Sequence, residues 1–413
     1  MAETYQIFVG IDWGAETHQV WLSNEAGTCI GERMVPHTGA DLVQLAAWLV
    51  SQTGGHAAAV AVALEVPHGP IVDTLLERGC HVFAINPKQL DRFRDRFSAA
   101  GAKDDRRDAR VLSSALRTDS IAFRRLDVDD PQTLQLREYS RQDTELGEDV
   151  RRLTNRLREH LLRIWPELLH LVPAADERWL WGLLKLAPTP IEARALRPVR
   201  VRHLLRSHHI RRITAEEVVT TLRTPSVRLA PGIREGVRVR ILDLVEQLRV
   251  VDTQRRHAER RLAQALAAMT EGPDGDQLRE HQDVTILQSL PAFGTRITAT
   301  MLAEAARPLR DRDYHALRLL AGVAPVTKRS GKSCVVVMRH ACHHRLRTAL
   351  HHWANGCLQR DPLCRAHYAV LRRAGHPHSR ALRGVADRML AVLIAMLKNQ
   401  TMYDPTRRHR LAA

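Results

Sequence analysis

Apolar and polar positions follow the periods of strands along roughly the first 120 residues. Alternation at every second residue is typical of a strand with one buried face, whereas a continuous apolar run of this length is typical of a central strand buried on both faces. The strands predicted in this way cover residues 6–12, 18–35 (a meander with a turn at Asn24–Gly27), 57–66 and 81–86. With a helix predicted at about 40–52, the pattern indicates an α/β domain.

The apolar spacing then changes to three and four, the period of an amphipathic helix. One such helix is predicted from Asp108, and two longer ones run from about Leu146 to Ile164 and from about Ile241 to Met269. Helices of this length suit an antiparallel coiled-coil arm or a dimer seam, but they equally suit an ordinary bundle core. The basic, proline-punctuated segment between them, residues 171–233, predicts no role.

A third unit is predicted to begin near residue 283. Residues 287–305 indicate two helices joined by a glycine-containing turn at Pro291–Gly294, a hairpin that can present backbone N–H groups to a phosphate. Residues 322–333 indicate a flexible basic loop, and helices follow to about residue 400. The predicted domains are therefore an α/β domain at 1–125, a helical coiled-coil arm and linker at 126–282, and a mainly helical domain at 283–405.

The charge of the chain favours a polyanionic partner. The net charge is +16, and residues 321–383 hold twelve Lys and Arg residues against one acid, Asp361. A GC-rich genome would explain the choice of Arg over Lys but not the missing acids. Such an excess favours nucleic acid, which is bound through phosphate contacts and counterion release.

The composition also excludes several other classes of protein. No apolar stretch is long enough for a membrane span, no secretory signal is visible, and the six cysteines lack a framework spacing. We therefore expect no membrane partner and a cytoplasmic location in which the thiols stay reduced.

Acidic residues mark the ends of the predicted strands. Asp12 ends the first strand, and Glu65 lies near the end of the apolar run, so the two acids converge if these strands are neighbours. Asp105 and Asp108, three residues apart at the start of a helix, share one face. Four carboxylates at one sheet edge repel one another unless divalent cations, Mg²⁺ or Mn²⁺, neutralise them.

Each acid also has a structural interpretation. Asp108 alone could be a helix N-cap and Asp105 a solvated loop acid, while the neighbouring Asp104 leaves the register open. Glu65 is harder to explain structurally, because burial of an unpaired carboxylate is costly. Taken together, the four acids favour a metal site.

Short motifs follow one another along the chain: IDWG (Asp12), LEVPHG (Glu65), INPKQ (85–89), AKDDRRDARVL (Asp105, Asp108), LPAFGTRITATMLAE, GVAP, Ser330–Gly331 and HRLRTALHHWA. These motifs and their order resemble the DEDD transposases, which have a RuvC-like RNase H fold, and more specifically the bridge-RNA-guided serine recombinases related to the Piv invertases. The resemblance covers nearly the whole chain, although Asp104 stands where the family commonly has Thr, and Arg329 replaces a second serine.

This resemblance implies that Ser330 is the nucleophile of a DNA transposase that forms a covalent phosphoserine link, with Ser333 as the alternative. It also implies double-stranded donor and target DNA, a structured guide RNA, and a homo-oligomer (dimer or tetramer). Taken alone, a Ser-Gly pair in a basic loop is more often a plain turn. The cations expected to bind nucleic acid are Arg329, Lys332, Arg339, Arg345 and Arg347.

Other functions remain open at this point. A RuvC-like nuclease would use activated water instead of Ser330, and a protein with an inactive site would need only the positive charge. VGIDWG also resembles the first hairpin of sugar kinases, but no second glycine-rich phosphate loop follows. A zinc site among the C-terminal His and Cys residues is disfavoured, because their spacing fits no familiar ligand pair.

Overall fold

The computed structural model describes residues 4–97, 104–126, 130–227, 230–270, 277–331 and 333–406. The chain divides into two compact units, residues 1–129 and 130–413. Among the described residues, no helix is both long and apolar enough to cross a membrane.

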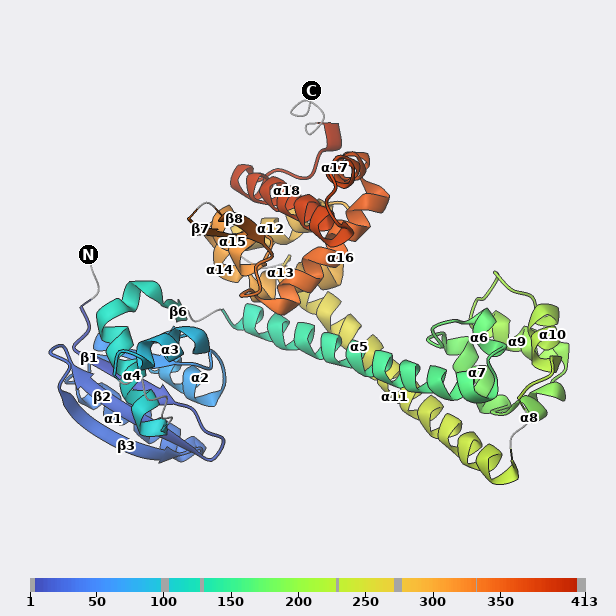
Figure 1. Cartoon of the computed structure of the whole chain (residues 1–413), viewed down its shortest axis with the longest axis horizontal. Coiled ribbons are helices and arrows are strands. Elements are labelled where there is room, and N and C mark those ends of the chain that lie inside the picture. The colour runs from blue at the N-terminus through green and yellow to red at the C-terminus, as the bar shows by residue number, and fades with distance from the viewer. Residues whose placement is uncertain are drawn as a thin grey trace. The chain divides into compact units, whose positions relative to one another are not determined.

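A mixed sheet forms the centre of the first unit (Figure 1). Its strand order is β3-β2-β1-β4-β5-β6, in which β1, β4 and β5 are parallel and the remaining pairs are antiparallel. The described strands are β1 (Ile7–Asp12), β2 (Thr17–Asn24), β3 (Cys29–Pro36), β4 (Val60–Leu64), β5 (His81–Ala84) and β6 (Arg124–Leu126). The predicted meander and its turn at Asn24–Gly27 are confirmed, with the Gly27 N–H bonded to the Asn24 carbonyl at 2.9 Å.

Helices cover both faces of this sheet, as its alternating side chains require. Odd-numbered apolar residues of β1, such as Val9, pack with α1 and α2, whereas Phe8 packs with α3 and α4. All five residues of β4 are buried, as the apolar run predicts. The helices are α1 (Gly39–Ser51), α2 (Pro70–Glu77), α3 (Pro87–Arg94) and α4 (Asp105–Asp119), with single 3₁₀ turns η1 (Ala57–Ala59) and η2 (Ser120–Ala122). The predicted α/β domain is confirmed.

One helix boundary differs from its prediction. α4 starts at Asp105 rather than at Asp108, because the extended Asp104 precedes the helix and its carbonyl accepts the Asp108 N–H at 2.9 Å. Asp108 therefore lies inside the first turn of the helix, and Asp104 occupies the N-cap position without making a side-chain cap hydrogen bond.

Two long helices, α5 (Pro131–Ile164) and α11 (Pro231–Ala268), lie side by side in the second unit (Figure 1). They are antiparallel, because Leu161 near the end of α5 shares a core with Ile241 near the start of α11, whereas Leu136 near the start of α5 shares a core with Leu262. The predicted long helices are confirmed. Their apolar stripes enter different cores at the two ends of the pair. The structure shows antiparallel pairing of the two helices, and the coiled-coil geometry stays a prediction.

Residues 171–227, part of the segment for which the sequence predicts no role, form a helical cap beside one end of this pair. Trp179 of the cap and Trp165, the residue after α5, are fully buried, and the cap shares this core with α5 and α11. The helices of the cap are α6 (Leu168–Leu171), α7 (Arg178–Leu186), α8 (Pro190–Arg194), α9 (Pro198–Ser207) and α10 (Ala215–Arg223).

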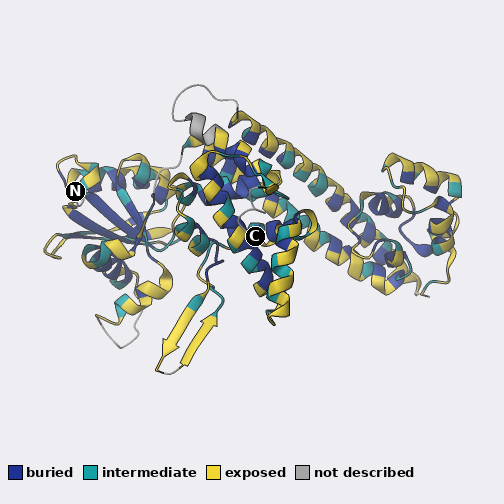
Figure 2. Cartoon of the chain, turned by 90° about the horizontal axis from the view of Figure 1, so that it is seen from above, coloured by how far each residue is buried: buried dark blue, intermediate teal, exposed yellow. Residues whose placement is uncertain are grey.

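The remaining helices form another core, and a hairpin of two strands projects from it (Figure 2). The helical hairpin predicted around Pro291–Gly294 is confirmed by α12 and α13. These elements are α12 (Gln277–Ser289), α13 (Thr295–Glu304), α14 (Ala306–Arg310), α15 (Tyr314–Leu320), β7 (Val326–Ser330), β8 (Ser333–Val337), α16 (His344–Arg360), α17 (Pro362–Arg373) and α18 (His378–Asn399).

The prediction of a flexible loop at residues 322–333 is wrong, because β7 and the start of β8 lie within this range. β7 and β8 are antiparallel, and Ser330 pairs with Ser333, which leaves two residues between the strands. Gly331 has φ +54°, a conformation that a glycine adopts without strain in such a tight turn. The β-branched residues of both strands favour extended backbone.

Gly10 provides a test of how α4 is held against the sheet. A Cβ at this position would lie 1.9 Å from the Ala109 carbonyl oxygen, so Gly10→Ala must push α4 away from β1. We expect Gly10→Ala to lower the free energy of unfolding by about 3 kcal/mol. Gly39→Ala is the control, because a Cβ there meets nothing within 4 Å. Urea denaturation of both variants measures the difference, and equal stability would contradict this packing.

Candidate active site

Two of the predicted acids stand at adjacent strand ends. β1 ends at Asp12, and Glu65 directly follows β4. Because β1 and β4 are parallel, with Ile11 opposite Leu64, Asp12 and Glu65 occupy the next positions along neighbouring strands. Both side chains are partly exposed. The parallel pairing that the sequence expected therefore brings these two acids to one edge of the sheet.

Asp108 is the buried member of the group, with a residue exposure of 1%. Its two carboxylate oxygens accept hydrogen bonds from Arg94, from Nε at 2.5 Å and from a terminal nitrogen at 2.7 Å. This bidentate pair supplies the partner that a buried carboxylate needs. It also ties α3, which ends at Arg94, to the first turn of α4.

The Arg94 guanidinium brings more than one acid together. It lies 3.8 Å from a Glu65 oxygen, and it also bonds to Asp91 one turn earlier on α3. The hydrogen bonds to Asp108, together with the charges of Asp108, Asp91 and Glu65, raise the pKa of Arg94 above its usual value. A single cation therefore stands among carboxylates from α3, α4 and the end of β4.

Asp105 takes no part in this cluster of contacts. It is exposed in the first turn of α4, as is Asp104 before it. Among the residues that the structure describes, no three His, Cys, Asp or Glu side chains are gathered closely enough to hold an ion. The structure thus brings together Glu65 and Asp108 around Arg94 and places Asp12 beside Glu65, while Asp105 remains apart.

The donor set nevertheless fits a divalent cation. Carboxylate oxygens are the hard ligands that Mg²⁺ prefers, and the guanidinium shows that these acids already gather around positive charge. Arg94 acts here as a stand-in for an ion. Its Nε and a terminal nitrogen each donate to one oxygen of Asp108, so each of these oxygens keeps a second lone pair that a metal could use.

The sequence interpretation missed Arg94, although a signal for it exists. Arg94 follows the fully buried Leu90 by four residues, which places both on one face of α3. The flanking Arg92 and Arg96 lie on other faces.

A buried histidine near Asp12 was also missed. His18 on β2 is fully buried, its Nε2 lies 2.8 Å from Nδ1 of His37, and its Nδ1 accepts the Gly14 N–H at 3.4 Å. Burial, and then the neighbouring His37, lower the pKa of His18. These contacts join the Gly14 backbone, two residues after Asp12, to His18 of β2 and to His37, the residue after β3. The alternating pattern of the strand does not predict that His18 is buried, because a polar residue at a core-facing position interrupts that pattern.

The predicted nucleophile lies on the second unit. Ser330 is exposed at the end of β7, and it shares a face of the hairpin with its partner Ser333 and with Lys328. Arg329 is exposed on the opposite face, across from Cys334. Lys332 lies outside the described residues.

The other predicted nucleic-acid contacts fall into two kinds of environment. Arg345 points into the protein, where it lies 3.2 Å from the nearly buried Glu304 and donates to Ser140 and Thr144. Arg339 and Arg347 instead line cavities at the base of the hairpin.

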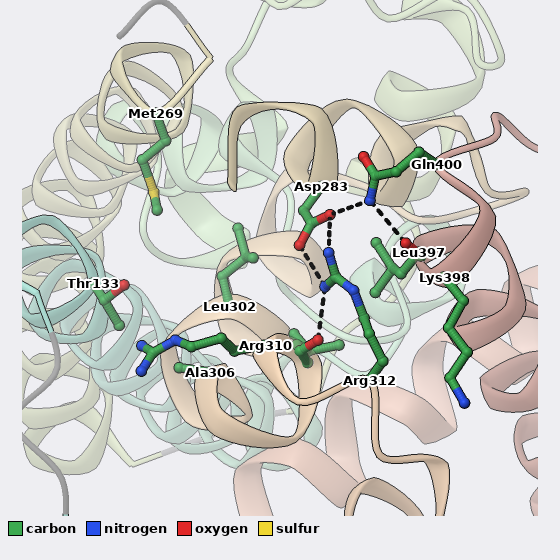
Figure 3. Close-up of a pocket in the computed structure, with 11 residues that line it drawn as sticks. Thr133, Met269, Asp283, Leu302, Ala306, Arg310, Arg312, Leu397, Lys398 and Gln400 are labelled. Carbon is green, nitrogen blue, oxygen red and sulfur yellow. Dashed lines mark hydrogen bonds and ion pairs between the residues drawn. The ribbon is translucent and has the colours of Figure 1, made fainter. Parts of the chain in front are cut away.

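A large cavity of about 710 Å³ lies elsewhere in the second unit, and no predicted site residue lines it (Figure 3). Arg312 lines this cavity and donates to both oxygens of Asp283, at 2.6 and 2.8 Å. Gln400 also reaches Asp283, at 3.4 Å. The central charges of this cavity are paired with each other, which indicates a structural role.

Comparisons with known proteins identify the class. Residues 9–166 match a model of DEDD transposases of the IS110 type, described as "Transposase". Residues 284–369 match a model described as "Transposase IS116/IS110/IS902 family". The first match contains all four predicted acids, and the mixed sheet with helices on both faces is consistent with an RNase H-like DEDD fold.

Relatives over the full length identify the family. A protein of Streptomyces coelicolor named for the mini-circle element IS117 is 30% identical over 98% of this chain and 97% of its own length. A protein of Sinorhizobium fredii, y4uE, is 49% identical over 52% of this chain, but the match spans only 60% of that relative. The IS110 protein of Streptomyces coelicolor is 26% identical over 97% of this chain. The chain belongs to the IS110/IS116 family of transposases, enzymes of DNA transposition.

Substitution of Arg94 should destabilise the protein, because Asp108 would lose its partner. We expect Arg94→Gln to lower the free energy of unfolding by about 3 kcal/mol, because Asp108 would stay buried without a cation. Arg96→Gln is the control, since its ion pair with Asp119 is exposed and contributes roughly 1 kcal/mol at most. Chemical denaturation in a chelator measures both variants. Equal losses would mean that Arg94 does not hold Asp108 in place.

Proposed function

We propose that this transposase cuts and rejoins DNA through a covalent phosphoserine link formed by Ser330, with assistance from Asp12, Glu65, Asp105 and Asp108. The observation that carries the proposal is the gathering of acids around positive charge at one edge of an RNase H-like sheet. The exposed position of Ser330 at a hairpin tip supports it, because the hydroxyl is accessible to a phosphodiester on the outside of a duplex.

The chemistry requires no cofactor that is consumed. The Ser330 oxygen attacks the phosphorus, a serine–phosphate bond forms, and one bridging P–O bond of the strand breaks. The serine proton passes to a carboxylate, and the departing strand end takes a proton to become a free hydroxyl. When a hydroxyl of a second strand attacks the phosphoserine, the phosphodiester re-forms and the serine regains its proton. The number of phosphodiester bonds is conserved.

The acids would hold a divalent ion at this site. Asp12, Glu65, Asp105 and Asp108 are the residues that would bind Mg²⁺ or Mn²⁺, which when bound supplies positive charge to the phosphate oxygens and favours ionisation of the attacking hydroxyl. Arg94 keeps Asp108 neutralised until then. Arg329 and Lys328 of β7 add positive charge beside the strand that Ser330 attacks.

We further propose that a structured RNA selects donor and target DNA, and that the chain works as a dimer or tetramer, as in the bridge-RNA-guided recombinases related to the Piv invertases. The excess of cations at residues 321–383 supports binding of more than one nucleic-acid strand. The remaining support is the family resemblance.

Trapping of the intermediate tests the role of Ser330. With DNA carrying the ends of the element, the wild-type protein should form a covalent adduct that survives denaturing electrophoresis, and Ser330→Ala should lose it. Ser333→Ala, which changes the cross-strand partner on the same face, should retain the adduct. Free hydrolysed ends with an active Ser330→Ala variant would instead establish a nuclease that uses activated water.

Substitution of the strand-end acids tests the metal site. We expect Asp12→Asn and Glu65→Gln each to slow adduct formation by about 10²- to 10³-fold, because charge stabilisation at the phosphate is lost. Asp73→Asn, an exposed acid on α2, is the matched control. A chelator should abolish the reaction, and added Mg²⁺ should restore it in wild type and control. A reaction that proceeds unchanged in the chelator would overturn this assignment.

A further inference from the structure

Two adjoining cavities lie at the base of the β7–β8 hairpin. Their volumes are about 270 and 180 Å³, and Arg383 lines both. Arg347 of α16 lines the first, and Arg380 of α18 lines the second. Val337, the last residue of β8, belongs to the second cavity, so the cavities adjoin the hairpin that carries Ser330.

These three arginines have little negative charge to balance them. Among the residues that line the two cavities, Asp387 is the one acid, and it already accepts hydrogen bonds from Tyr314 at 2.7 Å and Arg318 at 2.5 Å. Arg383 has a thioether for its hydrogen-bond acceptor, the sulfur of Met338 at 3.2 Å, which is a weak partner for a guanidinium. The group is therefore crowded with positive charge.

The energetic cost is visible at two of these side chains. Burial, followed by the positive charges of Arg380 and Arg347, lowers the pKa of Arg383 below its usual value. Arg347 has one terminal nitrogen that is buried and makes no hydrogen bond within the described part of the chain, while its other terminal nitrogen contacts His344. A buried donor without an acceptor is costly, so a ligand that accepts a hydrogen bond from this nitrogen would be favoured.

The start of α18 also lacks negative charge. Helix N-termini attract acids, yet the first turn of this helix holds His378, Ser379 and Arg380 and no acid, and no side chain caps it. Ser379 of this turn lines the first cavity. The positive end of a 22-residue helix is thus added to a cluster of guanidinium groups, an arrangement that suits an anion.

We propose that Arg347, Arg380 and Arg383 form a binding site for a backbone phosphate of a nucleic-acid strand. A guanidinium fork matches the geometry of phosphate oxygens, and three forks around small cavities can neutralise one phosphodiester. The site rests on the proposed function, because a transposase must hold nucleic acid near the residue that cuts it.

The hairpin sets the reach of this site. Four residue steps separate Val337 from Ser333, the partner of Ser330, which corresponds to ~13 Å of extended strand. Successive nucleotides of a duplex strand advance by about 3.4 Å, so this span corresponds to roughly four nucleotides. A strand anchored at the base of the hairpin can therefore extend to its tip.

Equilibrium binding of the full-length protein tests the site. The probes are labelled duplex DNA from the ends of the element and an RNA transcribed from its non-coding flank, each titrated at several salt concentrations. We expect Arg383→Ala and Arg380→Ala each to weaken binding by roughly tenfold and to reduce the slope of log affinity against log salt by about one. Arg360→Ala, at the far exposed end of α16, is the matched control for loss of one charge.

The two probes identify the source of the phosphate. A loss confined to DNA assigns the site to a DNA strand, and a loss confined to RNA assigns it to a guide, and either supports the proposal. Losses no larger than that of Arg360→Ala with both probes would overturn it. Because Arg380 is exposed, its variant should fold even if Arg383→Ala does not.

Adduct formation separates this proposal from the one on Ser330. Ser330→Ala should lose the adduct while its binding of both probes weakens no more than that of Arg360→Ala. Arg383→Ala should instead require more DNA to reach half-maximal adduct formation. If the wild-type protein forms no adduct, the serine mechanism fails, yet the binding comparison still decides the role of the arginines.

Discussion

The need to neutralise a buried carboxylate governs the first unit. Asp108 is almost completely inside the protein, where an unpaired negative charge would cost several kcal/mol. Arg94 meets this need through two hydrogen bonds, and in doing so it fixes α3 against α4 and draws Glu65 toward the same point. The pairing of β1 with β4 places Asp12 and Glu65 at the sheet edge, and the guanidinium joins Asp108 of α4 to Glu65.

The second unit instead contains a group of positive charges with little negative charge to balance them. Arginines at the base of the hairpin crowd together without a free acid, whereas Arg345, on the same helix α16 as Arg347, is paired with Glu304 inside the fold. Arg345 shows that an arginine on this helix can be paired with an acid inside the fold, whereas Arg347 lacks such a partner acid among the residues that line its cavity. Positive charge that is left unpaired in cavities, on a protein of transposition, is best explained by phosphate supplied by nucleic acid.

The sequence predicts those features whose signal is local. The strands and the long helices follow from apolar periodicity, and the ends of β1 and β4 follow from where the apolar residues stop, so Asp12 and Glu65 could be placed. The hairpin of Ser330 could not, because both of its faces are exposed and its strands lack alternation. Partners far apart in the chain, such as Arg345 with Glu304, depend on packing that no local pattern records.

The pairing of Arg94 with Asp108 also explains how the first unit can be stable before the protein binds DNA. If the carboxylates stood alone, their repulsion would loosen α4 from the sheet, and the free protein would lose the site that it needs later. With Arg94 in place, the buried charge of Asp108 is balanced by two hydrogen bonds from the guanidinium. In the mechanism that we propose, an ion bound at Asp108 would take over the charge that Arg94 now supplies, and the guanidinium could then move without leaving a buried carboxylate unpaired. Arg94 would in that case hold the acids in place until the ion binds.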